Sequence, residues 1–228
     1  MKLILSVFCL ILLLSCNIGG DNATPVEDPI IDTVEVEESP EEERDADDRQ
    51  YWQKPGEVIS MLGNLENKVV ADLGAGIGYF AFKLIRTAKK VIAIDVDPVK
   101  IDVLEGFKSG LPEEQSQKLE IRLATPDDSK LDDNEADIVL IVNTIAYIGN
   151  RVEYFRKLKN KLSEGGQIAI VDFKTKIIPS YVNAPPYDER EYLHVIEEEL
   201  IKAGYQIIVT DDTSLEYQYM IFAQAMSE

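Results

Sequence analysis

The chain has 228 residues, 45% of them hydrophobic, which is enough for one domain of ordinary size with extensions. Its 42 acidic residues outnumber 23 basic ones and give a formal net charge of −19. This balance argues against a nucleic-acid substrate, because phosphate backbones are bound through Lys and Arg. The only cysteines are Cys9 and Cys16, which excludes a disulfide, a cysteine metal site and a catalytic thiol from the rest of the chain.

The first sixteen residues have the features of an export signal. Lys2 is followed by an apolar run, residues 3–14, that is short for a membrane span, and Ser15 precedes Cys16. The sequence Leu-Leu-Ser-Cys at 13–16 resembles a bacterial lipobox, in which the signal is cut before a cysteine that is then lipidated. The resemblance implies a lipid anchor on Cys16 that holds the protein to a membrane of the bacterial cell envelope, outside the cytoplasm. An ordinary signal peptide that happens to contain Cys16 is the alternative.

Residues 17–50 are predicted to be a disordered acidic tether. They contain thirteen Asp or Glu against Arg44 and Arg49, with three prolines and little to bury. We interpret the tether as a solvated spacer, and a cation-binding or partner-binding tail is the alternative reading.

Residues 51–228 are expected to form a single α/β domain without internal repeats. Strands are expected at 68–73, 90–95, 118–123, 136–142 and 167–172, followed by an edge hairpin of 205–210 and 216–225. Helices are expected at 54–62, 78–88, 98–108, 151–162 and 188–203, the third of them capped by Asp97. Strands that alternate with helices indicate a parallel sheet with right-handed crossovers.

Two apolar runs carry the strongest functional signal. Residues 69–80 read VVADLGAGIGYF and residues 91–98 read VIAIDVDP. The glycines allow a sharp turn between strand and helix and let a ligand approach the backbone. Asp95 ends the second run and can accept two hydrogen bonds from a ribose diol. The pattern predicts a doubly wound sheet with an adenosine-type ligand at the carboxyl ends of its strands.

Two other interpretations of the glycine turn are less favoured. Glycines can simply close a strand-to-helix turn, but the second strand and its acid make that reading weaker. The NAD fingerprint is G-x-G-x-x-G, whereas this chain has G-x-G-x-G and no Tyr-x-x-x-Lys pair after the fourth strand. Asp72 would also repel a pyrophosphate, whereas it could receive an ammonium or sulfonium group. This favours S-adenosylmethionine as the ligand.

In this order and spacing, the motifs resemble the class I S-adenosylmethionine-dependent methyltransferases of small-molecule type. Similar segments are WQKPGEVI at 52–59, residues 126–148, LSEGGQIAIVDF at 162–173 and LEYQYMIF at 215–222. The resemblance covers residue 51 to the C-terminus. It implies a three-layer Rossmann-like sheet of strand order 3-2-1-4-5-7-6, with strand seven antiparallel.

The resemblance also implies which residues bind the cofactor. These are Asp72, Gly74, Gly76, Gly78, Tyr79, Asp95, Asp127 and Asn143. The glycines would line the methionine and ribose portion, Asp72 would orient the amino-acid end, and Asp95 would hold the ribose hydroxyls. Asp127 would lie near the adenine amine, although an exposed turn would also explain it. Asn143 would face the methyl-transfer position, although a turn-forming asparagine would also explain it.

No catalytic base is assigned, because in-line positioning supplies much of the acceleration of methyl transfer. Candidate catalytic or substrate-facing residues are Asn143, Tyr147 and Arg190, the last of which would equally suit an exposed salt bridge. The related subgroup often has two histidines where this chain has Ala146 and Tyr147. His194 is predicted to lie on a helix surface, and no metal site is expected.

The predicted function is methyl transfer from S-adenosylmethionine to a small molecule. The alternative is a non-catalytic exported binding protein that retains the fold, because the two histidines are missing and the signal directs the domain away from the cytoplasm. The methyl acceptor and the oligomeric state are left open by the sequence.

Overall fold

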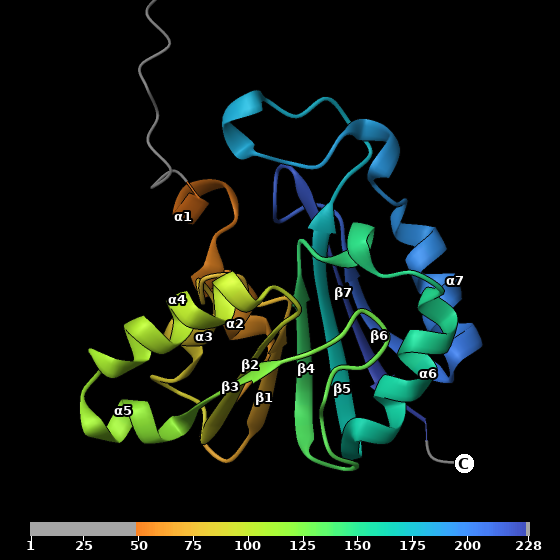
Figure 1. Ribbon diagram of the computed structural model, residues 1–228. Coiled ribbons are helices and arrows are strands. Elements are labelled where there is room, and N and C mark those ends of the chain that lie inside the picture. Colours follow the sequence, from red (N-terminus) through yellow and green to blue (C-terminus); the bar gives the residue numbers. More distant parts are fainter. Residues whose placement is uncertain (1–48, 227–228) are drawn as a thin grey trace, which may run out of the picture. The chain divides into compact units, whose positions relative to one another are not determined.

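The structure is a computed structural model that describes residues 49–226. The signal, Cys16 and the tether up to residue 48 lie outside this range. Within it, one sheet has the strand order β3-β2-β1-β4-β5-β7-β6 (Figure 1). Its strands are β1 Val69–Leu73, β2 Lys90–Asp95, β3 Leu119–Leu123, β4 Ala136–Val142, β5 Leu162–Phe173, β6 Tyr205–Asp211 and β7 Gln218–Ala225. Strand β7 runs antiparallel to both of its neighbours, β5 and β6, and all other pairs are parallel, so the predicted order and direction are confirmed.

Helices cover both faces of the sheet and give the molecule three layers. The α-helices are α1 Arg49–Trp52, α2 Pro55–Met61, α3 Ala81–Leu84, α4 Pro98–Ser109, α5 Glu113–Lys118, α6 Arg151–Lys161 and α7 Leu193–Ala203. Short 3-10 turns are η2 Ile145–Tyr147, η3 Ser180–Val182 and η4 Tyr187–Glu189. Figure 1 shows α2, α3, α4 and α5 on one side of the sheet and α6 and α7 on the other. Within residues 49–226, no helix is long and apolar enough to span a membrane.

The central strands contribute to two hydrophobic cores, one on each face. Along β2, Val91 and Ala93 pack under α3 and α4, while Ile92 and Ile94 belong to the core under α6 and α7. All four side chains are fully buried. Burial on both faces explains why these strands read as continuous apolar runs rather than as alternating patterns.

The structure shortens the helix expected at 78–88. Gly78 has a φ of 91° and still belongs to the turn, so α3 comprises only Ala81–Leu84. The expected cap of α4 is confirmed, because the Asp97 carboxylate accepts a hydrogen bond of 2.8 Å from the Val99 backbone N–H. Helix α5 was not predicted, and it begins after Pro112 with acidic residues in its first turn, as suits the helix dipole.

Other boundaries also differ from the sequence prediction. The helix expected at 188–203 begins only at Leu193, because Arg190 is extended with a ψ of 140° and separates it from η4. Strand β5 starts at Leu162, immediately after α6, rather than at 167. Arg49 and Gln50, assigned to the tether, lie in α1, and the contacts of Arg49 described below make it part of the domain.

Candidate functional site

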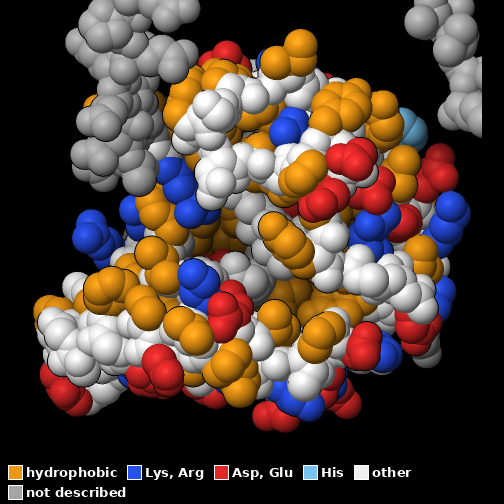
Figure 2. Space-filling view, turned by 45° about the horizontal axis from the view of Figure 1, so that its top comes forward, with side chains coloured by type: hydrophobic (Ala, Val, Ile, Leu, Met, Phe, Trp, Pro, Cys, Tyr) orange, Lys and Arg blue, Asp and Glu red, His pale blue; other side chains and the backbone are white. Residues whose placement is uncertain are grey.

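A cavity of about 550 Å³ opens at the carboxyl ends of β1, β2 and β4. The sheet extends from β1 to β2 on one side and to β4 on the other, and ligands of doubly wound sheets bind where the strand order reverses in this way. Figure 2 shows a hollow on this face with hydrophobic side chains on its rim. The lining residues are Leu73, Gly74, Gly76, Ile94, Asp95, Val96, Asp97, Lys100, Ala124, Thr125, Pro126, Asn143, Thr144, Tyr147, Ile148 and Tyr154.

The glycine turn forms the floor of the cavity after β1. The backbone N–H groups of Gly74 and Ala75 both donate to the Ile94 carbonyl, at 2.8 and 2.9 Å, which ties the turn to β2. Gly74 has a φ of 79°, and a Cβ there would lie 2.3 Å from the Thr144 hydroxyl oxygen. Gly76 has a φ of 57° and no atom within 4 Å of a Cβ position. Gly74 is therefore required for packing, whereas Gly76 leaves open space for a ligand.

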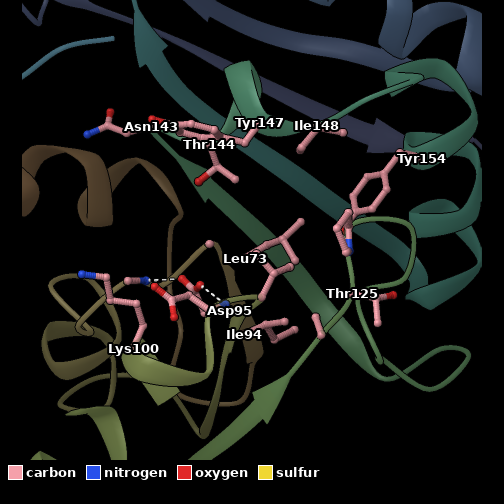
Figure 3. Close-up of a pocket in the computed structure, with 16 residues that line it drawn as sticks. Leu73, Ile94, Asp95, Lys100, Thr125, Asn143, Thr144, Tyr147, Ile148 and Tyr154 are labelled. Carbon is pink, nitrogen blue, oxygen red and sulfur yellow. Dashed lines mark hydrogen bonds between the residues drawn. The ribbon is translucent and has the colours of Figure 1, made fainter. Parts of the chain in front are cut away.

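The Asp95 carboxylate is fixed at the end of β2. Its Oδ2 accepts a 2.7 Å hydrogen bond from the Gly76 N–H, and its Oδ1 accepts a 3.0 Å bond from the Asp97 N–H (Figure 3). The side chain is half-buried and lines the cavity. Each carboxylate oxygen can accept a further hydrogen bond, so this group is suited to a vicinal diol.

Asp72 lies in β1, just before the glycine turn, and is only 2% exposed. Within residues 49–226, its buried Oδ2 has no hydrogen-bond partner. Burial raises the pKa of Asp72 to about 7, although the Ala81 N–H and the charge of Arg49 oppose the shift. A buried carboxylate oxygen without a partner is unfavourable, and a cationic ligand would relieve it.

The loop after β4 forms the opposite wall of the cavity. Figure 3 shows Asn143, Thr144 and Tyr147 on this side, across from Asp95 and Lys100. The buried Asp172 carboxylate accepts hydrogen bonds of 3.0 and 2.9 Å from the backbone N–H groups of Thr144 and Ile145, which holds the loop in place.

Asn143 both forms the turn after β4 and lines the cavity. It has a φ of 54°, so the turn-forming role considered from the sequence is correct, and it also lines the cavity. Tyr147 lines the cavity too, and with 71% of its surface exposed it stands at the rim. Both residues are therefore placed to contact a ligand.

Comparison with known proteins agrees with this geometry. Residues 71–170 match the family model described as "Methyltransferase domain". This segment is therefore similar to methyltransferase domains. It contains the glycine turn, β2, β4 and the loop that carries Asn143, which together form most of the cavity.

Parts of the chain are also similar to curated relatives. An uncharacterized methyltransferase of Mycobacterium tuberculosis is 31% identical over 117 residues, which are 51% of this chain and 44% of the relative. Phosphoethanolamine N-methyltransferase 3 of Arabidopsis thaliana is 25% identical over 177 residues, which are 72% of this chain and 34% of the relative. The chain thus spans less than half the length of these relatives.

Solved structures share the fold over most of the described chain. A SAM dependent methyltransferase from Aquifex aeolicus aligns with a TM-score of 0.71 and 21% identity, covering 78% of this chain and 93% of that one. The glycopeptide N-methyltransferase MtfA, solved with S-adenosylmethionine, has a TM-score of 0.63, 14% identity, and coverage of 76% and 87%. These likenesses show that the chain shares the fold of the two proteins.

Four residues predicted to bind the cofactor do not line the cavity: Asp72, which is buried next to the glycine turn, and Gly78, Tyr79 and Asp127. Gly78 and Tyr79 line a separate hollow beside α3, and a Cβ on Gly78 would lie 2.4 Å from the Phe82 ring, so this glycine serves packing. The Tyr79 ring lies between the Arg49 guanidinium, 4.1 Å from its centroid, and the Lys83 ammonium, at 4.2 Å. Asp127 lines another hollow beside α6. The structure thus brings together Gly74, Gly76, Asp95, Asn143 and Tyr147, with Asp72 behind them.

Arg190 does not line the cavity either. Its guanidinium donates hydrogen bonds of 2.7 Å to the Pro185 carbonyl and 2.8 Å to the Lys176 carbonyl. These bonds fasten the segment between β5 and α7, which Figure 1 shows beyond the carboxyl end of β5. Arg190 therefore shapes this segment, and neither the substrate contact nor the salt bridge considered from the sequence is seen.

Most of the other lining residues were not predicted from the sequence, among them the polar residues Lys100 and Thr125, and neither was the cation Arg49. Lys100 and Thr125 line the cavity, and Arg49 interacts electrostatically with Asp72. Lys100 could have been found, because it lies in the first turn of a helix that starts directly after Asp95. His194 is in the first turn of α7, and no group of His, Cys, Asp and Glu within residues 49–226 could hold a metal ion.

Proposed function

We propose that the protein binds S-adenosylmethionine in this cavity and transfers its methyl group to a small-molecule acceptor. One observation carries the proposal: the glycine turn is flanked by two carboxylates, Asp72 with a buried oxygen that has no partner within residues 49–226 and Asp95 held by two backbone N–H groups. The cavity beside them is large enough for a nucleoside with an amino-acid side chain.

The residues fit the cofactor group by group. Asp72 would receive the α-ammonium group, Asp95 the ribose hydroxyls, and the apolar side chains of Ile94, Val96 and Ala124 one face of the adenine. Gly76 would let the ligand approach the turn. When bound, S-adenosylmethionine supplies a methyl group on a positively charged sulfur, which is already electrophilic.

The residues of the chain would then act mainly by orientation. No histidine lines the cavity, and Asn143 and Tyr147 stand on the wall where an acceptor would approach. Holding the nucleophile in line with the methyl group supplies much of the acceleration without a base.

A non-catalytic binding protein is the second candidate. Ala146 and Tyr147 stand where similar methyltransferases often have two histidines. The fold also occurs in a protein described as the [4+2]-cyclase SpnF, with a TM-score of 0.66 and 14% identity, so the fold alone does not determine the reaction.

Incubation with S-adenosylmethionine labelled in its methyl group distinguishes the candidates. We expect label to pass from the cofactor to small molecules from a bacterial extract, and S-adenosylhomocysteine to suppress the transfer. Cofactor binding without transfer would favour the non-catalytic protein. Failure to bind the cofactor at millimolar concentration would contradict the proposed methyltransferase function.

We further propose that the protein is a lipoprotein of the bacterial cell envelope, anchored through Cys16. The support is the sequence of residues 1–16 and the acidic segment that follows. Cells that express the full chain should incorporate labelled palmitate into the wild type and not into Cys16→Ala, whereas Cys9→Ala leaves the mature protein labelled. Persistent label in Cys16→Ala would contradict the anchor.

A further inference from the structure

Four polar side chains form a hydrogen-bonded relay that ends at the cavity. Arg49 Nε donates to Gln53 Oε1 at 2.5 Å, Gln53 Nε2 donates to Gln218 Oε1 at 3.1 Å, and Gln218 Nε2 donates to Asn143 Oδ1. Gln53 and Gln218 are both 0% exposed. We call Arg49, Gln53, Gln218 and Asn143 the amide relay. It connects α1, the start of β7 and the loop after β4.

The direction of the amide relay is determined by its first member. A guanidinium has only donors, so the Gln53 group that faces Arg49 must be its carbonyl oxygen. The Gln53 amino group then faces Gln218, which must present its own oxygen there. By the same logic the Gln218 amino group faces Asn143 and engages the Asn143 oxygen. Reversing any one amide would place two donors or two acceptors together in a buried site, which is unfavourable.

One donor is left at the end of the relay. The Asn143 oxygen is used by Gln218, and no group within residues 49–226 accepts a hydrogen bond from Asn143 Nδ2. Asn143 lines the cavity on the wall opposite Asp95. We propose that Gln53 and Gln218 are positioning residues that make Asn143 a hydrogen-bond donor to the methyl acceptor, and that the acceptor offers a neutral carbonyl oxygen to it.

The charges around the cavity support a neutral group rather than a carboxylate. Asp95 and Asp97 line it against the single ammonium of Lys100, so an anionic acceptor would be repelled. A carbonyl oxygen accepts from an amide N–H without adding charge. The assignment of this ligand class rests on the proposed methyltransferase function, whereas the orientation of Asn143 rests on the relay alone.

Replacing Gln218 with glutamate reverses the relay in a pH-dependent manner. In the Gln218→Glu variant, a protonated carboxyl can accept from Gln53 and donate to Asn143 Oδ1, as the glutamine amide does. An ionised carboxylate can only accept, so Asn143 would turn its Nδ2 toward residue 218 and its oxygen toward the cavity. A side chain that merely fills space would show no such dependence on protonation.

The probe is N,N-dimethylacetamide, a neutral carbonyl compound without donors, titrated into the full-length protein saturated with S-adenosylhomocysteine. NMR signals of the Asn143 side-chain NH₂ report both binding and orientation. We expect Gln218→Glu to bind the probe like wild type at low pH and about tenfold more weakly at high pH, the size expected when one hydrogen bond is lost and two acceptors meet. An Asn143 signal and a probe affinity that follow the wild-type pH profile would overturn the proposal.

The comparison with wild type is needed because other charged groups lie around residue 218 and Asn143. Arg49 lies on α1, Asp72 on β1 and Asp172 on β5, and the raised pKa values of the two aspartates fall near 7 and 6. Only the difference between variant and wild type is therefore assigned to residue 218.

Two further variants separate the possible outcomes. Gln224→Glu makes the same change on β7 at a partly exposed side chain that contacts the Gly165 carbonyl, and it should leave the Asn143 signals unchanged. Gln218→Met removes both polar groups of the side chain, and it should weaken binding of the probe at every pH. If the protein fails to bind S-adenosylhomocysteine but its Asn143 signals respond as expected in Gln218→Glu, the proposed function fails and the relay stands. If the cofactor binds normally but the Asn143 signals do not respond, the relay fails and the proposed function stands.

Discussion

Replacing Asp72 with asparagine is expected to weaken S-adenosylmethionine binding about 100-fold, the effect of removing one partner of a buried charge pair. The asparagine keeps the shape of the side chain but cannot neutralise an ammonium group. Calorimetric titration of wild type and variant measures the difference. A dissociation constant within about threefold of wild type would show that Asp72 does not contact the cation.

The same substitution should stabilise the ligand-free protein at neutral and higher pH. Burial raises the pKa of Asp72 from its ordinary value of 3.8 to about 7. The protonated form is therefore favoured in the folded state, and the stability it provides is lost as pH rises from about 4 through 7. Asp72→Asn should raise the free energy of unfolding by up to roughly 4 kcal/mol at about pH 8 and change it little near pH 4.

Urea denaturation at the two pH values tests this sign, and Asp172→Asn is a matched control. The pKa of Asp172 is also raised by burial, to about 6, but its oxygens accept from the backbone N–H groups of Thr144, Ile145 and Phe173. Replacing it should therefore destabilise the loop after β4 rather than stabilise the protein. A loss of stability in Asp72→Asn at the higher pH would contradict the raised pKa.

Alanine at Gly74 and at Gly76 should have opposite kinds of effect. Gly76→Ala has free space for its Cβ, so its free energy of unfolding should fall by only about 1–2 kcal/mol because of the left-handed backbone. Its methyl group, however, would stand where the ligand approaches. We expect near-normal folding with cofactor affinity reduced at least about tenfold. In Gly74→Ala the new Cβ would lie 2.3 Å from the Thr144 hydroxyl oxygen, at a backbone φ of 79°. The free energy of unfolding should therefore fall by about 3–5 kcal/mol.

The second substitution Thr144→Ala provides the control for this pair. It removes the atoms that a Cβ on Gly74 would approach most closely, so it should recover part of the stability of Gly74→Ala and none of the cofactor affinity of Gly76→Ala. Thermal denaturation and calorimetric titration of the single and double variants measure both. Equal destabilisation by the two glycine substitutions would contradict the separate roles.

Sequence patterns identified the central strands because these are buried on both faces, and the resemblance in motif order implied the topology. They also located the glycine turn and Asp95, since these residues lie within one strand–turn–strand unit of about 30 residues. Helix α5 was missed and the helix at 78–88 was predicted too long, because local charge and glycine conformation, rather than apolar periodicity, determine these elements.

The amide relay could not be predicted from sequence. Its contacts join Gln53 to Gln218 and Gln218 to Asn143 across 165 and 75 positions, and no spacing rule connects them. Family position places Asp127 at the cofactor, whereas the structure puts it at a neighbouring hollow. The same reasoning makes Arg190 a substrate contact, but it bonds to backbone carbonyls of its own segment.

A crystal structure of the protein with S-adenosylhomocysteine tests the central claim most directly. We predict the ribose hydroxyls within hydrogen-bond distance of Asp95 and the ammonium group beside Asp72. An empty cavity at saturating ligand, or a nucleoside bound elsewhere with both carboxylates uninvolved, would contradict the assignment of this site.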